Sequence, residues 1–254
     1  MNHLSIHALE DFPLIRPNDN LSSIIIDSII NNNISIDNGD VILIAQKVVS
    51  KSENRYKDLS KINPSKEAIN IGESLDRDPA FIQLILEESN EILSTDKNVI
   101  IVEHKLGYIN INAGIDRSNI SENKNLVLLL PENPKKSATY IQSQISKQLK
   151  KDISVIITDS MTRPYRAGIT NFAIASSNIQ SLIDLKGEED IFGNKLLATE
   201  IAIADELAAA SGLLMGQGND MKPVVIIKGF DRSKYSINNA FDLIINKDDD
   251  LYRF

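Results

Sequence analysis

The sequence predicts a mixed α/β fold of the α+β kind, because short apolar runs of strand length alternate with longer helical patterns in no strict order. No internal repeat and no low-complexity linker divides the chain. Its 254 residues therefore suit a single unit over residues 1–254, or two closely joined lobes. A chain of this length buries roughly 70% or more of its unfolded surface, so its core needs no covalent cross-links.

The elements of the first half follow from the apolar pattern, with Asp19 or Asn20 as the cap of the first helix. The predicted strands are residues 4–9, 40–49, 99–102 and 108–111, and the last two form a hairpin around residues 105–107. The predicted helices are residues 21–30, 65–75 and 79–92. The polar residues 51–61 indicate a mobile surface segment or a plain loop.

In the second half, strand-length apolar runs become more frequent. The predicted strands are residues 126–130, 154–158, 172–175 and 223–228. The predicted helices are residues 137–149 and 199–211. The second of these helices is rich in alanine, so it is expected to pack closely against a neighbour.

Composition excludes several classes of protein. There is no cysteine, which excludes disulfides, thiolate metal ligands and a cysteine nucleophile. Three histidines, at positions 3, 7 and 104, cannot complete a usual structural zinc site. A net charge of −8 and a pI near 5.0 argue against nucleic acids and anionic membranes as partners. No signal peptide and no apolar run of about 18 residues is present, so we expect a cytoplasmic protein.

Two aspartates each follow an apolar run and are predicted to stand where a strand ends. Asp116 closes Asn-Ala-Gly-Ile-Asp, and Asp159 closes Ile-Ile-Thr-Asp before Ser160. The alternative for Asp116 is a tight turn with an aspartate cap. Ligands usually bind at the carboxyl ends of strands in open α/β sheets, and carboxylate and hydroxyl oxygens suit magnesium or manganese.

A cation explains why both carboxylates are kept. At about 4 Å and an effective dielectric constant of about 20, two negative charges repel by about 4 kcal/mol. A divalent ion reverses the sign of that interaction. The pair therefore indicates metal-assisted chemistry on a phosphorylated substrate.

Three polar segments add candidate contacts, each with a simpler alternative. Arg163 and Arg166, held by a proline, could clamp phosphate or carboxylate, or form a solvated basic loop. The glycine-rich residues 213–220 could wrap phosphates, or simply cap a helix. Lys47 and Lys51 could meet phosphate, or form a charged sheet edge. No Walker motif and no Gly-x-Gly-x-x-Gly is present.

Taken together, the motifs resemble the coenzyme F420-0:L-glutamate ligase (gamma-glutamyl ligase) family. The likeness runs in order from about residue 9 to residue 230. The segments that carry it are Pro13-Leu14-Ile15, Gln46-Lys47-Val48-Val49-Ser50-Lys51, Asn112-Ala113-Gly114-Ile115-Asp116 with Ser118-Asn119, Ile157-Thr158-Asp159-Ser160, Arg163-Pro164-Tyr165-Arg166-Ala167-Gly168, Asp190-Ile191-Phe192-Gly193, Ala204-Asp205-Glu206-Leu207-Ala208 and residues 213–220.

The resemblance implies a two-lobed α/β fold particular to that family and a homodimer. It implies that GTP is consumed with Mg²⁺ or Mn²⁺, often with K⁺, to join L-glutamate to the lactyl-phospho-deazaflavin coenzyme F420-0 through an acyl phosphate. No protein nucleophile is then needed, because metals and basic groups align the reactants. The catalytic residues expected are Asp116, Asp159, Arg163 and Arg166, and the metal ligands expected are Asp116, Asp159, Ser160 and Gln217.

The resemblance also implies nucleotide contacts along four segments. They are Glu10, Asp11, Phe12 and Pro13; Gln46, Lys47 and Lys51; Asn119; and Leu213, Leu214, Met215, Gly216, Gln217, Gly218, Asn219 and Asp220.

Three positions depart from the family pattern. Gln217 stands where glutamate is usual, Ser160 where threonine is usual and Thr162 where glycine is usual. A neutral amide is a weaker ligand than a carboxylate, so Gln217 is expected to weaken a second cation site. Two alternatives therefore remain: a related amide ligase with another carboxylate acceptor, and a non-catalytic nucleotide- or deazaflavin-binding homologue.

Overall fold

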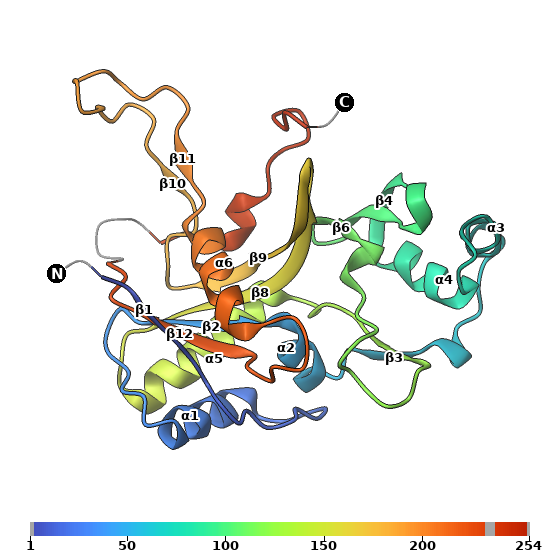
Figure 1. Ribbon diagram of the computed structural model, residues 1–254, viewed down its shortest axis with the longest axis horizontal. Coiled ribbons are helices and arrows are strands. Elements are labelled where there is room, and N and C mark those ends of the chain that lie inside the picture. Colours follow the sequence, from blue (N-terminus) through green and yellow to red (C-terminus); the bar gives the residue numbers. More distant parts are fainter. Residues whose placement is uncertain (1–2, 232–236, 253–254) are drawn as a thin grey trace.

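A five-stranded sheet in the order β1-β12-β2-β8-β9 forms the larger part of the molecule (Figure 1). The computed structural model describes residues 3–231 and 237–252 of the chain. Only β2 and β8 pair in parallel, and the other neighbours are antiparallel. The strands are β1 (Ser5–Ala8), β12 (Val224–Lys228), β2 (Val41–Ala45), β8 (Ser154–Arg163) and β9 (Arg166–Ser177).

Helices cover both faces of this sheet. Ile42 and Ile44 of β2 belong to a buried cluster with residues of α1 (Leu21–Asn31) and α5 (Pro134–Leu149). Val41 and Leu43 point the other way, into a cluster with α6 (Ile203–Met215). Successive side chains of a strand point to opposite faces and both faces are covered here, so β2 is apolar at every position.

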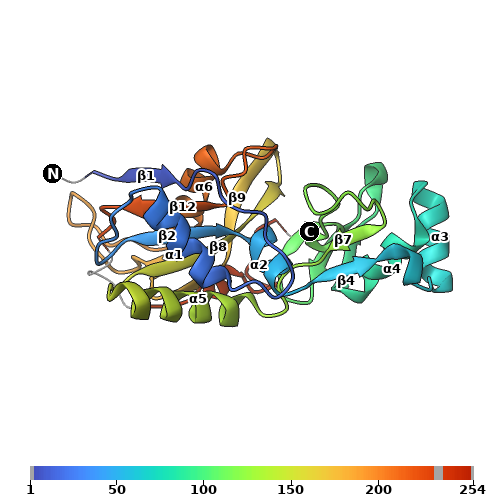
Figure 2. The same cartoon turned by 90° about the horizontal axis from the view of Figure 1, so that it is seen from below.

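The smaller part of the molecule has its own buried cluster, which includes Phe81, Ile85, Val102, Ile115 and Val127. Figure 2 shows it beside the main sheet, with which it makes an elongated shape. Its elements are β3 (Tyr56–Asp58) paired with β7 (Leu126–Leu128); the sheet of β4 (Ser89–Ser94), β5 (Ile101–His104) and β6 (Ile109–Ile111); α3 (Lys66–Leu75) and α4 (Pro79–Glu87); and the 3-10 turns η1 (Leu59–Lys61), η2 (Asp96–Asn98) and η3 (Asn112–Gly114).

Most predicted elements are present, with shifted ends. Asn20 caps α1 by accepting from the backbone N–H of Ser23, as one of the two expected caps. The β5–β6 hairpin, β7, β12 and α3 are confirmed. Ala204 and Ala208 of α6 are fully buried, which confirms the close packing expected of that helix, although it begins at Ile203 rather than residue 199. Among the described residues, no helix combines the length and apolar character needed to cross a membrane.

The prediction of strand over residues 46–49 is wrong. β2 ends at Ala45, and α2 (Gln46–Ser52) begins at once. Val48 and Val49 favour strand by propensity, but both are buried when the segment turns into a helix. Packing therefore outweighs propensity, and the change of direction sends Gln46 and Lys47 toward the carboxyl end of the sheet.

Two further predictions are wrong in the smaller part. The helix expected over residues 79–92 ends at Glu87, because Ser89–Ser94 pairs with β5 as a strand. The segment 51–61 is not a plain loop. It holds the end of α2, β3 and η1, and its Leu59 is buried. Strand pairing with distant residues, which a local pattern does not reveal, decides both.

Asp159 does not stand where a strand ends, contrary to the prediction. β8 passes through it and continues to Arg163, paired throughout with β9. What ends near Asp159 is the pairing with β2, whose last partners are Ala45 and Thr158. A hairpin thus projects beyond the sheet. A second projecting arm, the segment that runs from β10 (Ile183–Asp184) to β11 (Glu200–Ile201), was not predicted (Figure 1). The 3-10 turn η4 (Ala240–Leu243) follows near the C-terminus.

Candidate active site

The parallel pair β2–β8 brings two polar segments together at the carboxyl ends of these paired strands. Gln46 and Asp159 each come directly after the paired residues Ala45 and Thr158. Because parallel strands end on the same side, their side chains enter the same space. Thr158 itself is buried. The main sheet therefore supplies one half of the candidate site.

The other half comes from the smaller part through a strained turn. Asn112, Ala113 and Gly114 have φ values of 53°, 55° and 64°, a left-handed run that only glycine adopts at little cost. A Cβ on Gly114 would lie 2.8 Å from Nδ2 of Asn110, so any larger residue would also have to displace that side chain. After the turn, Asp116 exchanges two backbone hydrogen bonds with Leu128, of 2.9 and 3.0 Å. The tight turn expected as the alternative is present, and it aims Asp116 at β8.

Asp116 is held by an amide and an ammonium group from α2. Nε2 of Gln46 donates to Oδ2 of Asp116 at 2.7 Å, and Nζ of Lys47 lies 3.3 Å from Oδ1. The hydroxyl of Ser50 donates to Oε1 of the buried Gln46, which fixes the orientation of the amide. Burial raises the pKa of Asp116, while Lys47 and Gln46 lower it. These contacts leave the carboxylate partly neutralised on one side.

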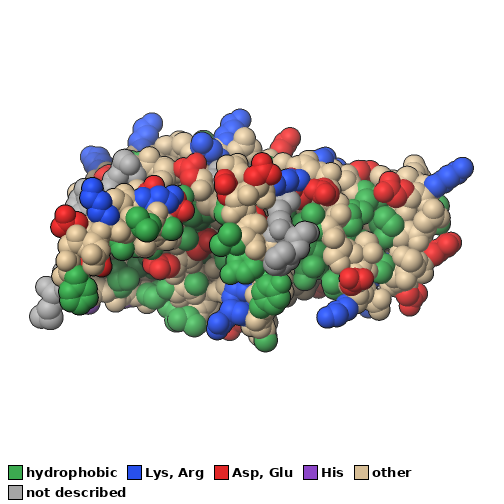
Figure 3. Space-filling view, turned by 90° about the horizontal axis from the view of Figure 1, so that it is seen from above, with side chains coloured by type: hydrophobic (Ala, Val, Ile, Leu, Met, Phe, Trp, Pro, Cys, Tyr) green, Lys and Arg blue, Asp and Glu red, His purple; other side chains and the backbone are tan. Residues whose placement is uncertain are grey.

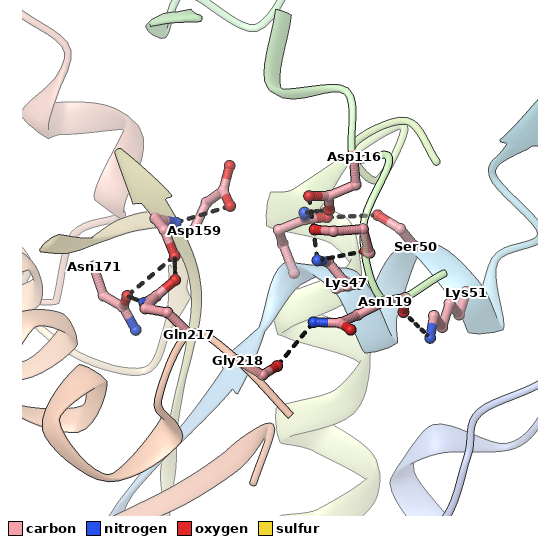
Figure 4. Close-up of polar contacts among 12 residues, drawn as sticks. Lys47, Ser50, Lys51, Asp116, Asn119, Asp159, Asn171, Gln217 and Gly218 are labelled. Atoms are coloured by element: carbon pink, nitrogen blue, oxygen red, sulfur yellow. Dashed lines mark hydrogen bonds and ion pairs between the residues drawn. The ribbon is translucent and has the colours of Figure 1, made fainter. Parts of the chain in front are cut away.

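In the part of the chain that the structure describes, no lysine or arginine forms an ion pair with Asp159, although the charge of Lys47 lowers its pKa. Burial, and then the negative charge of Asp116, raise its pKa to about 7. The backbone N–H of Ser160, 2.8 Å from Oδ1, acts in the opposite direction. Burial and the charge of Asp159 also raise the pKa of Tyr108, whose hydroxyl donates to the carbonyl of Ile174. Figure 4 shows the two carboxylates on opposite sides of one gap.

A second set of oxygen atoms lies next to Asp159 (Figure 4). Oγ of Ser160 donates to Oε1 of Gln217 at 2.8 Å, and Nε2 of Gln217 donates to Oδ1 of Asn171 at 3.1 Å. Oγ of Ser160 also lies 3.4 Å from Oδ1 of Asn171, but its single proton suits the shorter contact. The buried Asn171 therefore fixes the side-chain amide of Gln217, with its oxygen turned toward Ser160.

These residues fit a magnesium or manganese ion better than zinc. The donors are the carboxylates of Asp116 and Asp159, the hydroxyl of Ser160 and the amide oxygen of Gln217, and all are hard oxygen atoms. Among the described residues, no group of three or more His, Cys, Asp or Glu side chains could hold a metal. Mg²⁺ commonly uses one or two carboxylates and completes its shell with water and phosphate oxygens. Burial is the main cause of the raised pKa values of both aspartates, and Lys47 offsets it only in part.

A cavity of about 830 Å³ opens onto the two carboxylates. Most residues predicted as nucleotide or metal contacts line it: Phe12, Pro13, Gln46, Lys47, Lys51, Asp116, Asn119, Asp159, Ser160, Met215, Gly216, Gln217, Gly218 and Asn219. The volume lies within the range of small-molecule sites. The structure thus brings the separate motifs to one cavity.

Other predicted residues lie outside the lining of this cavity. Glu10 pairs with Lys222 at 2.8 Å, and Asp220 accepts from the backbone N–H of Gly218 at 3.2 Å, so both hold neighbouring loops. Arg163 and Arg166 lie near the tip of the β8–β9 hairpin. The remaining three are Asp11, Leu213 and Leu214.

Three hydrogen bonds connect the loops around the cavity. Nζ of Lys47 donates to the carbonyl of Ser118, and Nζ of Lys51 donates to that of Asn119. Nδ2 of Asn119 then donates to the carbonyl of Gly218 at 2.8 Å. Burial, followed by the charge of Lys47, lowers the pKa of Lys51. Two ammonium groups that crowd each other in this way would be stabilised by a phosphate.

Sequence reasoning missed Asn171 and Lys222, which also line the cavity. Asn171 lies inside a strand and has no motif around it. The sequence gives no signal for it; in the structure, a Cβ on Gly212 of α6 would lie within 3.0–3.3 Å of its amide group. The small residue and the buried amide therefore belong together.

A family model for F420-0:gamma-glutamyl ligases matches residues 11–229. The chain belongs to this family. Its relatives include proteins named coenzyme F420:L-glutamate ligase from three archaea. The protein of Methanocaldococcus jannaschii is 43% identical over 218 residues, 86% of each chain. That of Methanothermobacter thermautotrophicus is 37% identical over 227 residues, 89% of each chain. That of Methanosarcina mazei is 41% identical over 224 residues, 88% of this chain and 85% of its own.

Membership of the F420-0:gamma-glutamyl ligase family confirms the resemblance seen in the motifs. The matched residues contain both aspartates, α2, the β8–β9 hairpin and the loop after α6. They include residues of both the larger and the smaller part of the molecule. Every residue that lines the cavity lies among the residues that the family model matches.

Proposed function

We propose that this chain ligates L-glutamate to coenzyme F420-0, with GTP as the phosphoryl donor and Mg²⁺ or Mn²⁺, and K⁺ where the family uses it. Relatives of similar length that carry this activity in their names support the reaction. The observation that carries the proposal is the facing pair Asp116 and Asp159 in a cavity that also presents Lys47 and Lys51. We also propose that the whole chain acts as one ligase unit, because both parts of the molecule line that cavity. Cytoplasmic residence stays a prediction.

The carboxylate of the acceptor must be activated, because it has no good leaving group of its own. A carboxylate cannot expel oxide when an amine attacks it. Transfer of the γ-phosphoryl group of GTP to a carboxylate oxygen releases GDP and makes an acyl phosphate. The amine of glutamate then attacks the carbonyl carbon, inorganic phosphate leaves with the bonding electrons, and the nitrogen loses a proton. A bound divalent cation supplies charge neutralisation to the phosphoryl group.

The residues of this chain bind and align the reactants. Lys47 and Lys51 offer positive charge on one wall of the cavity, and Gln46 holds Asp116 in place. Asn119 ties the loop of residues 118–122 to the loop after α6, so a triphosphate would lie between two connected loops. The apolar segment at Phe12 and Pro13 forms a further part of the lining, suited to the flat face of a base. No step requires a nucleophile from the protein.

We further propose that the chain forms a homodimer through the β10–β11 arm. Ile191, Phe192 and Leu197 of this arm are 92%, 83% and 88% exposed. A two-stranded ribbon of this kind is marginally stable in water by itself. A second copy of the chain would cover the apolar tip and stabilise the arm.

A mass spectrum of F420-0 after incubation with GTP, Mn²⁺ and L-glutamate tests the reaction. The expected result is gain of one or more glutamyl residues, dependent on all three additions. Turnover only with another carboxylate acceptor would support the related-ligase alternative. Binding of GTP or F420-0 without turnover would support a non-catalytic homologue, for which the neutral Gln217 is the motivating feature. A covalent protein intermediate in the same spectrum would contradict the acyl-phosphate route.

A further inference from the structure

The β8–β9 hairpin carries an exposed tyrosine at an unfavourable backbone position. Pro164 and Tyr165 form its turn, and Tyr165 has a φ of 59° with 83% of its surface exposed. After proline in such a turn, glycine or asparagine normally takes the left-handed position. An aromatic residue there is strained, and strain of this kind concentrates at functional sites. The hairpin thus accepts a cost in stability and presents a ring at its tip.

A second tyrosine, from the far end of the chain, lies beside the first. The ring centroids of Tyr165 and Tyr252 are 6.2 Å apart, and Tyr252 is 65% exposed. The C-terminal segment is anchored below this point by Lys247, which pairs with Glu91 and Glu103 at 2.8 Å each. Figure 1 shows the segment rising next to the hairpin. Since both rings remain largely open to solvent, their mutual contact uses only part of their apolar surface.

Two arginines flank the tip. Arg163 and Arg166 are register partners across the hairpin. In the described part of the chain neither guanidinium has an ion pair, and Arg163 donates only to the carbonyl of Gly168, at 3.3 Å. Guanidinium groups bind phosphate through paired N–H donors and also stack on aromatic faces. The tip therefore combines affinity for an anion with affinity for a planar ring.

The hairpin connects this tip to the reacting end of the cavity. Ser160 lines the cavity beside Asp159, and Arg163 follows three residues later, about 10 Å along an extended strand. On β9, Asn171 and the half-exposed Ile169 line the cavity before the strand reaches Arg166. Figure 3 shows the face toward which the hairpin projects, where hydrophobic side chains gather near the middle beside a hollow. From Ser160 to its tip, the hairpin thus presents an oxygen ligand, two arginines and Tyr165, and the C-terminal segment adds Tyr252.

We propose that this tip, defined by Arg163, Tyr165, Arg166 and Tyr252, is the subsite for the planar, phosphate-bearing tail of the acceptor. The inference rests on the proposed function, whose acceptor carries a lactyl carboxylate, a phosphate and a deazaflavin ring in that order. With the carboxylate at Asp159 and Ser160, the phosphate extends toward the arginines and the ring reaches the tyrosines. Tyr252 lies outside the residues matched by the family model, 11–229.

The test measures binding of F420-0 by its deazaflavin fluorescence, in the full chain, for Tyr165→Ala, Tyr252→Ala and Arg166→Gln. Loss of one stacking contact is worth about 1–3 kcal/mol, so each tyrosine variant should raise the Kd for F420-0 about 5- to 150-fold. Arg166→Gln should raise the Kd and reduce its dependence on salt. The Kd for GTP should not change. Tyr140→Ala is the matched control, because Tyr140 is 57% exposed on α5.

Tyr165→Gly separates a binding role from a structural one. Glycine relieves the left-handed backbone, so this variant should unfold at a higher temperature than the wild type while binding F420-0 as weakly as Tyr165→Ala. Tyr165→Phe should bind nearly as tightly as the wild type. If the tyrosine variants bind F420-0 as well as Tyr140→Ala does, the subsite is refuted while the proposed function stands. If the wild type neither binds nor modifies F420-0, the proposed function fails first.

Discussion

Replacement of Asp159 by asparagine should make the cation-free protein more stable at neutral and alkaline pH. Burial and the charge of Asp116 raise the pKa of Asp159 from its ordinary 3.8 to about 7. The folded chain therefore binds this proton more tightly than the unfolded chain does. Folding stability is unaffected by this group below pH 3.8, falls as the pH rises toward about 7, and stays reduced above it.

The size of this effect follows from the same values. A pKa that rises from 3.8 to about 7 corresponds to about 4 kcal/mol, at about 1.4 kcal/mol for each tenfold change in the proton equilibrium. Asparagine has nearly the same shape and no charge to bury. At about pH 8 we expect Asp159→Asn to raise the free energy of unfolding by up to about 4 kcal/mol, and at about pH 4 we expect little change.

Urea unfolding in the presence of a chelator measures the free energy of unfolding of the wild type and of Asp159→Asn at each of these two pH values. Asp27→Asn is the control, because it removes a carboxylate from an exposed position of α1. Adding Mn²⁺ should stabilise the wild type against urea and leave the stability of Asp159→Asn nearly unchanged. In the activity assay, Asp159→Asn and Asp116→Asn should each abolish turnover. Equal stability of wild type and Asp159→Asn across this pH range would refute the argument that Asp159 carries a buried, uncompensated charge.

Three other substitutions test separate parts of the structure. Gln217→Glu should bind Mn²⁺ more tightly than the wild type in a calorimetric titration, because it replaces a neutral oxygen by a carboxylate beside Ser160; equal affinity would contradict the idea that Gln217 weakens a second cation site. Asn171→Ala should lower the free energy of unfolding by about 0.5–1.5 kcal/mol in urea, because the hydrogen bond that the buried Asn171 accepts from Nε2 of the exposed Gln217 is lost; no measurable loss would show that water replaces the amide. Phe192→Asp should shift the protein from dimer to monomer in light scattering after size-exclusion chromatography, because a charge cannot be buried at the apolar arm tip; an unchanged dimer would place the interface elsewhere.

The sequence predicted the residue types of the site better than its backbone. Asp116, Asp159, Gln46 and Lys47 line one cavity as their motifs indicated. The reason is that catalytic groups cluster at short segments with unusual chemistry, which a local pattern reveals. The ends of the strands were harder to predict from the sequence. β8 continues past Asp159 because β9 pairs with it, and no local pattern contains that partner.

Three features lay beyond any local pattern. α2 replaces the predicted strand after Ala45, because burying Val48 and Val49 outweighs their strand propensity. Asn171 lies just before the predicted strand of residues 172–175, and it gains its role only when the loop after α6 folds back and brings Gln217 to it. The β10–β11 arm was missed for a related reason, since most of its residues have no regular secondary structure.

The two aspartates come from different parts of the molecule, and this affects how the protein unfolds. Asp159 belongs to the main sheet, while Asp116 is bonded to Leu128 next to the β3–β7 pair of the smaller part. A cation held by both would cross-link the main sheet and the smaller part of the molecule. Such an ion adds to stability by an amount that grows with the logarithm of its concentration. Without it, repulsion between the two carboxylates weakens the contact between the two parts, so the cation-free chain should unfold at a lower temperature. The midpoint of unfolding should then rise steadily as the cation concentration is raised.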